Sequence, residues 1–255
     1  MINKIEKKII SLDVKYIFNL PKLVFTVLML VILLIFFLSL NNSNVLVDIV
    51  LYLLITLVAV LGILINKFIA SSVRLILTEN IDLEKYQDYF DYAYSHSNKS
   101  QAKNLKQLKK ISEGQVLYLK GKWIKSLEVL NSINNKQNTV TIKSNYMDIA
   151  DYYSCLSYIK LGNYKTVEKY LTNLSDKNSE LVNAILKVEH GETTQYFESL
   201  NPETHLQLIT KHYYSALNEL NSGNKEKAKE WFQTIATENP ELFYVREAKQ
   251  YLEEN

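Results

Sequence analysis

The sequence contains a single cysteine, Cys155, among its 255 residues. This count excludes an intramolecular disulfide and any zinc site that needs a pair of cysteines. Folding without such cross-links fits a reducing compartment. Cys155 also lies at a small-residue position of an expected helix, so we interpret it as a buried structural thiol rather than a reactive one.

Arginine is nearly absent, since Arg74 and Arg246 are the only two in the chain. The formal net charge is +2, and beyond residue 65 the basic and acidic side chains are equal in number. Nucleic-acid binding depends on a net basic surface, and arginine is the favoured donor to phosphates and bases. We therefore expect no nucleic acid among the partners.

Catalytic and cofactor motifs are also missing. The chain has six glycines and three prolines, and no glycine-rich phosphate loop, nucleophile elbow, calcium loop or His-Glu-x-x-His motif. His205 and His212 share a helical face, but two turns separate them by about 10 Å, too far to bind one metal unaided. The sequence predicts no catalytic residue, no cofactor and no metal site, and therefore no enzyme.

Two long apolar runs are present near the N-terminus. Residues 23–40 carry no charge, and residues 45–65 carry only Asp48, one turn from their start. At about 1.5 Å per residue, a helix over 23–40 covers about 27 Å, close to the hydrocarbon thickness of a bilayer. The polar residues 41–44 are too few for a long connection, so we expect a transmembrane hairpin within residues 23–70 and a bilayer as one partner.

Basic residues flank only one end of this hairpin. Five lysines precede residue 23, Lys67 and Arg74 follow the second run, and residues 41–44 have none. Basic flanks stay in the cytoplasm, which predicts a cell-membrane protein of two spans with both termini inside. A cleaved signal peptide is disfavoured because the apolar run starts late and no small-residue cleavage site follows it.

Residues 1–22 form a basic segment that precedes the first span. Apolar residues recur within it at helical spacing, which suggests an amphipathic helix on the inner leaflet ending near Pro21. A solvated basic tail is an equally good interpretation.

Beyond the spans, apolar residues recur at helical spacing through most of the chain. We expect a connecting helical region over 71–100 and a helical repeat domain over 101–255. The polar tract 134–145 reads as a loop. The expected helices cover residues 82–96, 101–120, 123–133, 146–161, 165–174, 179–190, 193–200, 204–222, 225–238 and 241–253.

Glycine spacing gives the sharpest signal in this region. A small residue stands seven positions before each of four glycines that separate expected helices, and the glycines are 41, 29 and 32 residues apart. Such spacing is typical of stacked helical hairpins, because the glycine ends the first helix and the small residue allows close approach of the second. The four pairs are Gly114 with Gly121, Cys155 with Gly162, Ala184 with Gly191, and Ala216 with Gly223.

The last pair extends into a longer pattern, with Ala228, Phe232 and Pro240 at five, nine and seventeen residues after Gly223. This unit resembles the tetratricopeptide repeat (TPR) family, and the three earlier units resemble it more loosely. The resemblance covers about residues 101–255 and implies an all-α fold in which the hairpins form an α-solenoid.

The same resemblance implies a concave groove that receives a protein partner. The positions matching the family's groove are Tyr118, Tyr152, Leu156, Tyr213 and Leu217. Tyrosine suits binding surfaces because it combines apolar area with a hydroxyl group. The alternative is that these rings fill gaps between helices, which is where most such residues lie.

These observations favour a membrane-anchored, TPR-like scaffold that binds a protein partner at the cytoplasmic face. One alternative is a hairpin that self-associates into a homo-oligomeric pore, toxin-like or immunity-type assembly regulated by the repeats. Pores need polar residues at depth, and the spans offer few. Another alternative is an enzyme or enzyme subunit whose site carries no recognisable motif.

Overall fold

The computed structural model describes residues 4–40, 45–133 and 144–255, and within these ranges the regular secondary structure is entirely helical. This confirms the all-α class. The chain divides into two compact units, Met1–Leu77 and Thr78–Asn255. The expected turn at 41–44 and most of the expected loop at 134–145 lie outside the described residues.

The first unit begins with two helices that meet at Asp13. Helix α1 covers Lys4–Ser11 and α2 covers Val14–Leu40. The Asp13 carboxylate accepts a hydrogen bond from the Lys15 amide at 2.8 Å, as an N-terminal helix cap does. The helix break therefore lies at Asp13, and not near Pro21 as expected, because α2 runs through Pro21.

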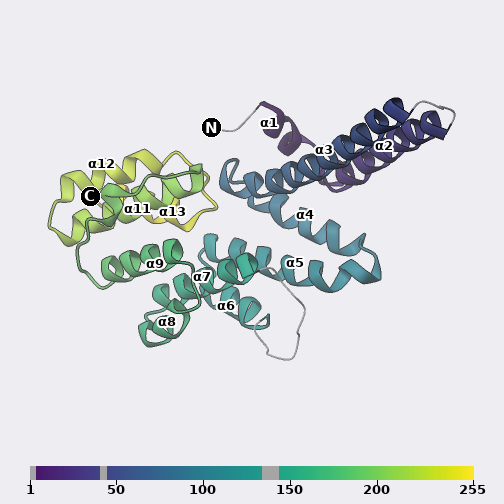
Figure 1. The fold of residues 1–255 in the computed structure, drawn as a ribbon. Coiled ribbons are helices and arrows are strands. Elements are labelled where there is room, and N and C mark those ends of the chain that lie inside the picture. Colours follow the sequence, from purple (N-terminus) through teal and green to yellow (C-terminus); the bar gives the residue numbers. More distant parts are fainter. Residues whose placement is uncertain (1–3, 41–44, 134–143) are drawn as a thin grey trace. The chain divides into compact units, whose positions relative to one another are not determined.

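Helices α2 and α3 lie side by side and form the apolar hairpin (Figure 1). Helix α3 covers Val45–Thr78, and its 34 residues exceed what one span requires. Near the hairpin turn, Ser39 Oγ donates to an Asp48 carboxylate oxygen at 3.1 Å. Further along, Gly62 allows a close approach, because an added Cβ would lie 2.7 Å from Leu28 Cδ1.

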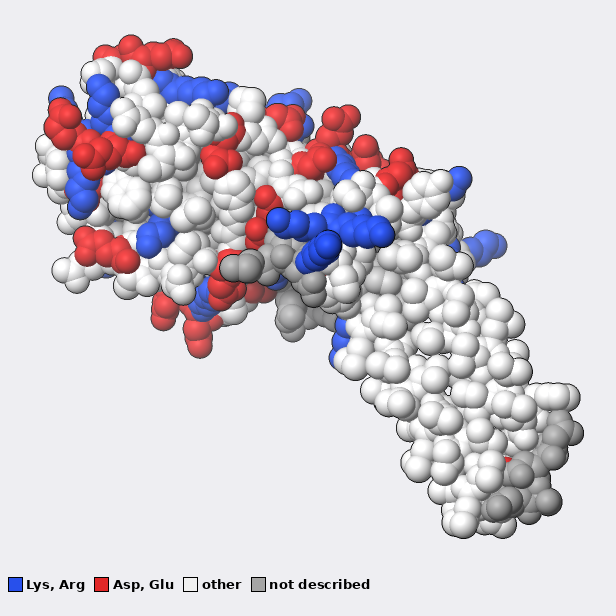
Figure 2. Space-filling view, turned by 90° about the horizontal axis from the view of Figure 1, so that it is seen from above, with Lys and Arg blue, Asp and Glu red and all other residues white. Residues whose placement is uncertain are grey.

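Both hairpin helices are long and apolar enough to cross a membrane. Their exposed large apolar side chains have exposed fractions from 38% to 73%. Figure 2 shows this surface almost free of Lys, Arg, Asp and Glu. Apolar surface of this extent is unfavourable in water and marks a membrane or protein contact.

The second unit consists of helices that pack mainly against their neighbours in sequence (Figure 1). Helices α5, α7, α9 and α11 also contact one another in that order. The helices are α4 (Leu83–Ser95), α5 (Lys99–Leu119), α6 (Trp123–Asn131), α7 (Ser144–Lys160), α8 (Tyr164–Leu171), α9 (Asp176–Glu189), α10 (Tyr196–Ser199), α11 (His205–Asn221), α12 (Lys225–Ile235) and α13 (Phe243–Glu254).

The four turn glycines end α5, α7, α9 and α11 in the same way. Gly121, Gly162, Gly191 and Gly223 have φ between +71° and +82°. At the first turn, the Gly121 amide donates to the Tyr118 carbonyl and the Lys122 amide to the Leu117 carbonyl, each at 2.8 Å. The other three turns repeat this pair of bonds, which is the Schellman motif that favours glycine.

Small residues allow the paired helices to approach closely. The first pair shows this most clearly, because an added Cβ at Gly114 would lie 2.4 Å from Leu130 Cδ2. Ser126 Oγ donates to the Gly114 carbonyl at 2.8 Å, joining α6 to α5. At the corresponding positions of the later units, Cys155, Ala184 and Ala216 are buried.

The third hairpin departs from the expectation. A second helix was expected over 193–200, but α10 is a single turn, Tyr196–Ser199. The Thr194 amide is instead held by Asn218 Oδ1 at 2.8 Å. As a result α11 lacks a full-length neighbour on this side.

Candidate functional site

The interior of the second unit is filled by the C-terminal helix, α13. Phe243 and Tyr244 at its start are each only 2% exposed. The Tyr244 ring centroid lies 4.9 Å from that of Tyr213, and the Phe243 centroid lies 5.4 Å from that of Tyr118. The Tyr118 and Tyr244 hydroxyl oxygens are 3.4 Å apart. Helix α13 therefore covers the inner face of α5 and α11.

This packing decides what the five predicted groove residues can contact. Tyr118, Leu156 and Tyr213 are at most 1% exposed, while Tyr152 and Leu217 are half-buried. The three buried residues contribute to the core and are not an open surface in this structure. A partner reaches them only if α13 moves.

A lysine at the end of α7 joins three other helices in this interior. Lys160 Nζ lies 2.8 Å from Glu189 Oε1 of α9 and 3.6 Å from Glu247 Oε2 of α13, and its side chain is 8% exposed. The same ammonium donates to the Tyr213 hydroxyl at 2.9 Å. Two carboxylates compensate the cost of burying this charge.

Aromatic rings complete the surroundings of Lys160. Its Nζ lies 5.0 Å from the Phe243 ring centroid, 5.1 Å from that of Tyr213 and 5.8 Å from that of Trp123. The Tyr213 hydroxyl also donates to Glu247. Burial, followed by the charges of Glu247 and Glu189, raises the pKa of Tyr213 well above its ordinary value, so this hydroxyl stays protonated.

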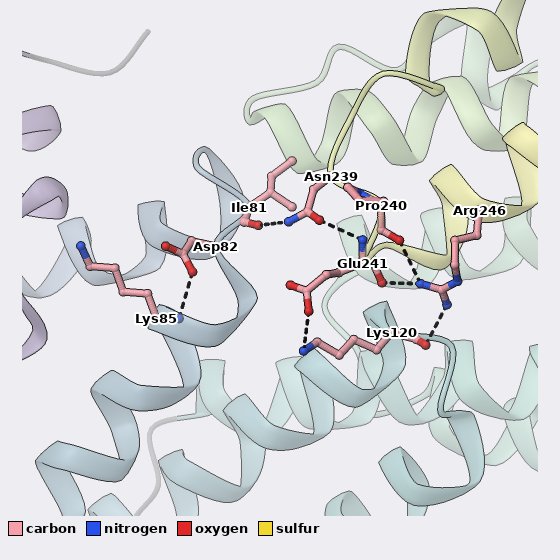
Figure 3. Close-up of polar contacts among 8 residues, drawn as sticks. All are labelled: Ile81, Asp82, Lys85, Lys120, Asn239, Pro240, Glu241 and Arg246. Atoms are coloured by element: carbon pink, nitrogen blue, oxygen red, sulfur yellow. Dashed lines mark hydrogen bonds and ion pairs between the residues drawn. The ribbon is translucent and has the colours of Figure 1, made fainter.

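A polar clasp holds the segment before α13 against two distant turns (Figure 3). Arg246 donates to the Glu241 carbonyl at 2.6 Å and to the Lys120 carbonyl at 2.9 Å. The Lys120 ammonium pairs with the Glu241 carboxylate at 2.8 Å. Exposed ion pairs contribute little individually. Here the Lys120–Glu241 pair is reinforced, because Arg246 also binds the backbone carbonyls of both residues.

The clasp also reaches the turn between α3 and α4. Asn239 Nδ2 donates to the Ile81 carbonyl at 2.7 Å (Figure 3). Ile81 has φ of +53°, a conformation that is strained for a β-branched residue. His205 lies nearby, with Nδ1 3.3 Å from the Glu79 carbonyl and Nε2 3.0 Å from Glu238 Oε1. His205 therefore contributes to this turn.

A small pocket is lined by residues of α10, α11 and α12, and we call it the α11 groove. It encloses a cavity of about 120 Å³. Phe197 and Trp231 contribute aromatic rings to its lining, and Lys227 and Glu219, which also line it, pair at 2.5 Å. The lining residues are Phe197, Glu198, Lys211, Ser215, Asn218, Glu219, Lys227 and Trp231.

The remaining predicted residues are structural. Cys155 is fully buried, and burial together with the Asp151 charge raises the pKa of its thiol to about 12. Ala228 and Phe232 are buried in α12, and the Pro240 carbonyl accepts a hydrogen bond from Arg246 at 3.3 Å. Across the described part of the chain, no group of three His, Cys, Asp or Glu side chains is placed to hold a metal ion.

The sequence analysis did not identify the Lys160 cluster, although one signal was available. Lys160 and Glu189 each stand two residues before a turn glycine, Gly162 and Gly191, so they occupy equivalent positions in neighbouring hairpins. Opposite charges at equivalent positions predict an ion pair between stacked units. Glu247 lies in α13, outside this register, and could not be found in the same way.

Comparison with known proteins found no match for this chain among family models, curated proteins or solved structures.

Proposed function

We propose that this protein is a membrane-anchored scaffold that holds a protein partner at the cytoplasmic face of the membrane. The observation that carries the proposal is the contrast between the two units. The exposed apolar surface of α2 and α3 suits lipid, whereas the described exposed large apolar residues beyond Leu77 are isolated ones, namely Ile124, Tyr146, Leu161 and Leu208. A solvated helical unit tied to a bilayer is the architecture of a scaffold.

The orientation in this proposal has both termini in the cytoplasm. Its support is the position of the basic residues, because Lys15 and Lys22 precede the apolar part of α2, and Lys67 and Arg74 follow that of α3. Positive residues next to a span favour the cytoplasmic side.

The second unit is proposed to be a TPR-like α-solenoid of four hairpins followed by α13. Four observations support this: the repeated Schellman turns, the small residues seven positions before them, the sequential contacts of α5, α7, α9 and α11, and the Ala228, Phe232 and Pro240 pattern. Helix α13 would then stand where the first helix of a further hairpin begins.

The partner is proposed to bind at the α11 groove rather than in the filled interior. Exposing Phe243 or Tyr244 to water would cost about 2 kcal/mol for each side chain, so displacement of α13 is unfavourable. The α11 groove needs no such rearrangement. Trp231 is half-buried there, and tryptophan is among the residues that dominate binding energy at protein interfaces.

Isolation of the full-length chain from its native membranes in mild detergent tests this proposal. We expect a stoichiometric protein partner whose affinity falls by about tenfold or more in Trp231→Ala. Tyr164→Ala is the matched control, because Tyr164 is another half-buried aromatic residue with its ring beside a histidine, 3.8 Å from His190. Equal binding by both variants would contradict the site, and recovery of a homo-oligomer alone would favour a self-associating hairpin.

A further inference from the structure

Helix α1 has three exposed lysines and two buried isoleucines, while Ile5 is 59% exposed. Lys4, Lys7 and Lys8 are exposed, whereas Ile9 is 7% and Ile10 is 2% exposed. Ile9 and Ile10 are therefore part of the protein interior.

Four further basic side chains of the same unit are exposed. We call the seven the basic collar; it comprises Lys4, Lys7, Lys8, Lys15, Lys22, Lys67 and Arg74. The unit keeps a positive balance, because it has seven basic residues and three acidic ones, Glu6, Asp13 and Asp48. Asp48 lies beside the hairpin turn, where it accepts from Ser39, and the Asp13 carboxylate caps α2.

The collar adjoins the apolar part of the hairpin along the chain. Lys22 immediately precedes the uncharged run that begins at Leu23, and its Nζ lies 4.4 Å from the Phe18 ring centroid. Tyr16, six residues before Lys22, is 64% exposed. Exposed aromatic and lysine side chains just outside a span are typical of the headgroup layer.

We propose that the basic collar binds the headgroups of anionic phospholipids, and that the three exposed lysines of α1 contribute to this binding. This inference rests on the proposed insertion of α2 and α3 into a membrane. Six of the seven collar residues are lysines, which act as point charges and suit a diffuse layer of phosphates better than a single bidentate site. The cations come from three helices, α1, α2 and α3, and a bilayer surface offers many phosphates to such a set of separate charges.

Charge at a membrane surface has a measurable effect on lipid composition around a protein. Each lysine within reach of an anionic leaflet contributes about a fivefold preference for anionic over neutral lipid, and salt weakens this preference. Neutralising three lysines of α1 should therefore reduce the enrichment of anionic lipid by more than half. Replacing them with arginine should preserve it.

The test reconstitutes the full-length chain in vesicles of phosphatidylcholine with a minority of phosphatidylglycerol. The protein is then extracted in mild detergent, and the lipids that remain bound are quantified by mass spectrometry. We expect retained phosphatidylglycerol to exceed its share of the vesicle lipid, and K4Q/K7Q/K8Q to lose most of this excess. The matched control is K125Q/K225Q/K249Q, which removes the same charge from three exposed lysines of the second unit.

Two further arms separate the possible failures. Flotation with pure phosphatidylcholine vesicles tests insertion alone, and a chain that does not float overturns the proposed function as well as this inference. A chain that floats but retains phosphatidylglycerol only in proportion to the bulk overturns the inference alone. Loss of the excess on adding inorganic phosphate at constant ionic strength would also overturn it, because the collar would then bind a free anion.

Discussion

Buried thiol and histidine side chains of the second unit give the most direct tests at the scale of single residues. Cys155 occupies the small-residue position of α7 and is fully buried. His212 is half-buried, with Nδ1 2.9 Å from Thr234 Oγ1 and its ring 4.9 Å from that of Trp231. Each environment changes a protonation equilibrium in a defined direction.

Cys155 should be unreactive in the folded protein. Burial, then the Asp151 charge, raises the pKa of its thiol to about 12, so the nucleophilic thiolate is scarce near neutral pH. We expect iodoacetamide to label the native chain slowly and the urea-unfolded chain rapidly, as followed by intact-mass spectrometry. Equal rates in the two states would show that the thiol is accessible.

His212 should make the second unit sensitive to acid. Burial, then the Lys211 charge, lowers its pKa from 6.5, so below that pH the unfolded chain takes up a proton that the folded chain resists. Stability should therefore fall as the pH drops through this range. His212→Asn should lose less of its thermal stability than the original chain between about pH 7.5 and about pH 5. An identical loss in both would contradict this role.

At the scale of elements, each hairpin of the second unit depends on close contact between its two helices. In the first hairpin, an alanine Cβ at Gly114 would lie 2.4 Å from Leu130 Cδ2 and 2.5 Å from Leu130 Cγ. Such contacts force either α6 or the Leu130 side chain to shift. Gly114 is therefore required for packing, although glycine weakens a helix.

We expect Gly114→Ala to lower the free energy of unfolding by about 1–3 kcal/mol, because overpacking outweighs the gain in helix propensity. Thermal unfolding of the detergent-solubilised chain, followed by fluorescence, measures the change, since both tryptophans lie in the second unit. The control places Gly114→Ala in a Leu130→Ala background, where the space is free. A destabilisation of equal size in that background would show that contact with Leu130 is not the cause.

The sequence predicted most helices of the second unit, whereas for the first unit it predicted apolar spans and not the ends of the helices. Hydropathy marks the apolar part of a helix, so the expected span over 23–40 lies inside α2, which starts at Val14 after the Asp13 cap. In the same way α3 continues to Thr78, beyond the expected span over 45–65. The start of α2 is set by the local bond from Lys15 to Asp13, which an average over many residues does not detect.

At the scale of the whole molecule, what the sequence could not predict is contact between residues far apart in the chain. The expected groove assumed an inner face free of the chain itself, whereas Phe243 and Tyr244 of α13 fill it. The hydrogen bond from Arg246 to the Lys120 carbonyl joins two residues that do not occupy corresponding positions in the repeats. The all-α class and the two apolar helices are confirmed, because both follow from local periodicity and hydropathy.

The central claim for the whole molecule is that α2 and α3 are buried in a lipid bilayer and anchor the remainder. Alkaline carbonate extraction of native membranes, followed by flotation on a density gradient, tests it most directly. We predict that the full-length chain floats with the lipid, because its exposed apolar helices stay in the bilayer when peripheral contacts are released. Recovery of the full-length chain in the carbonate supernatant would contradict the account.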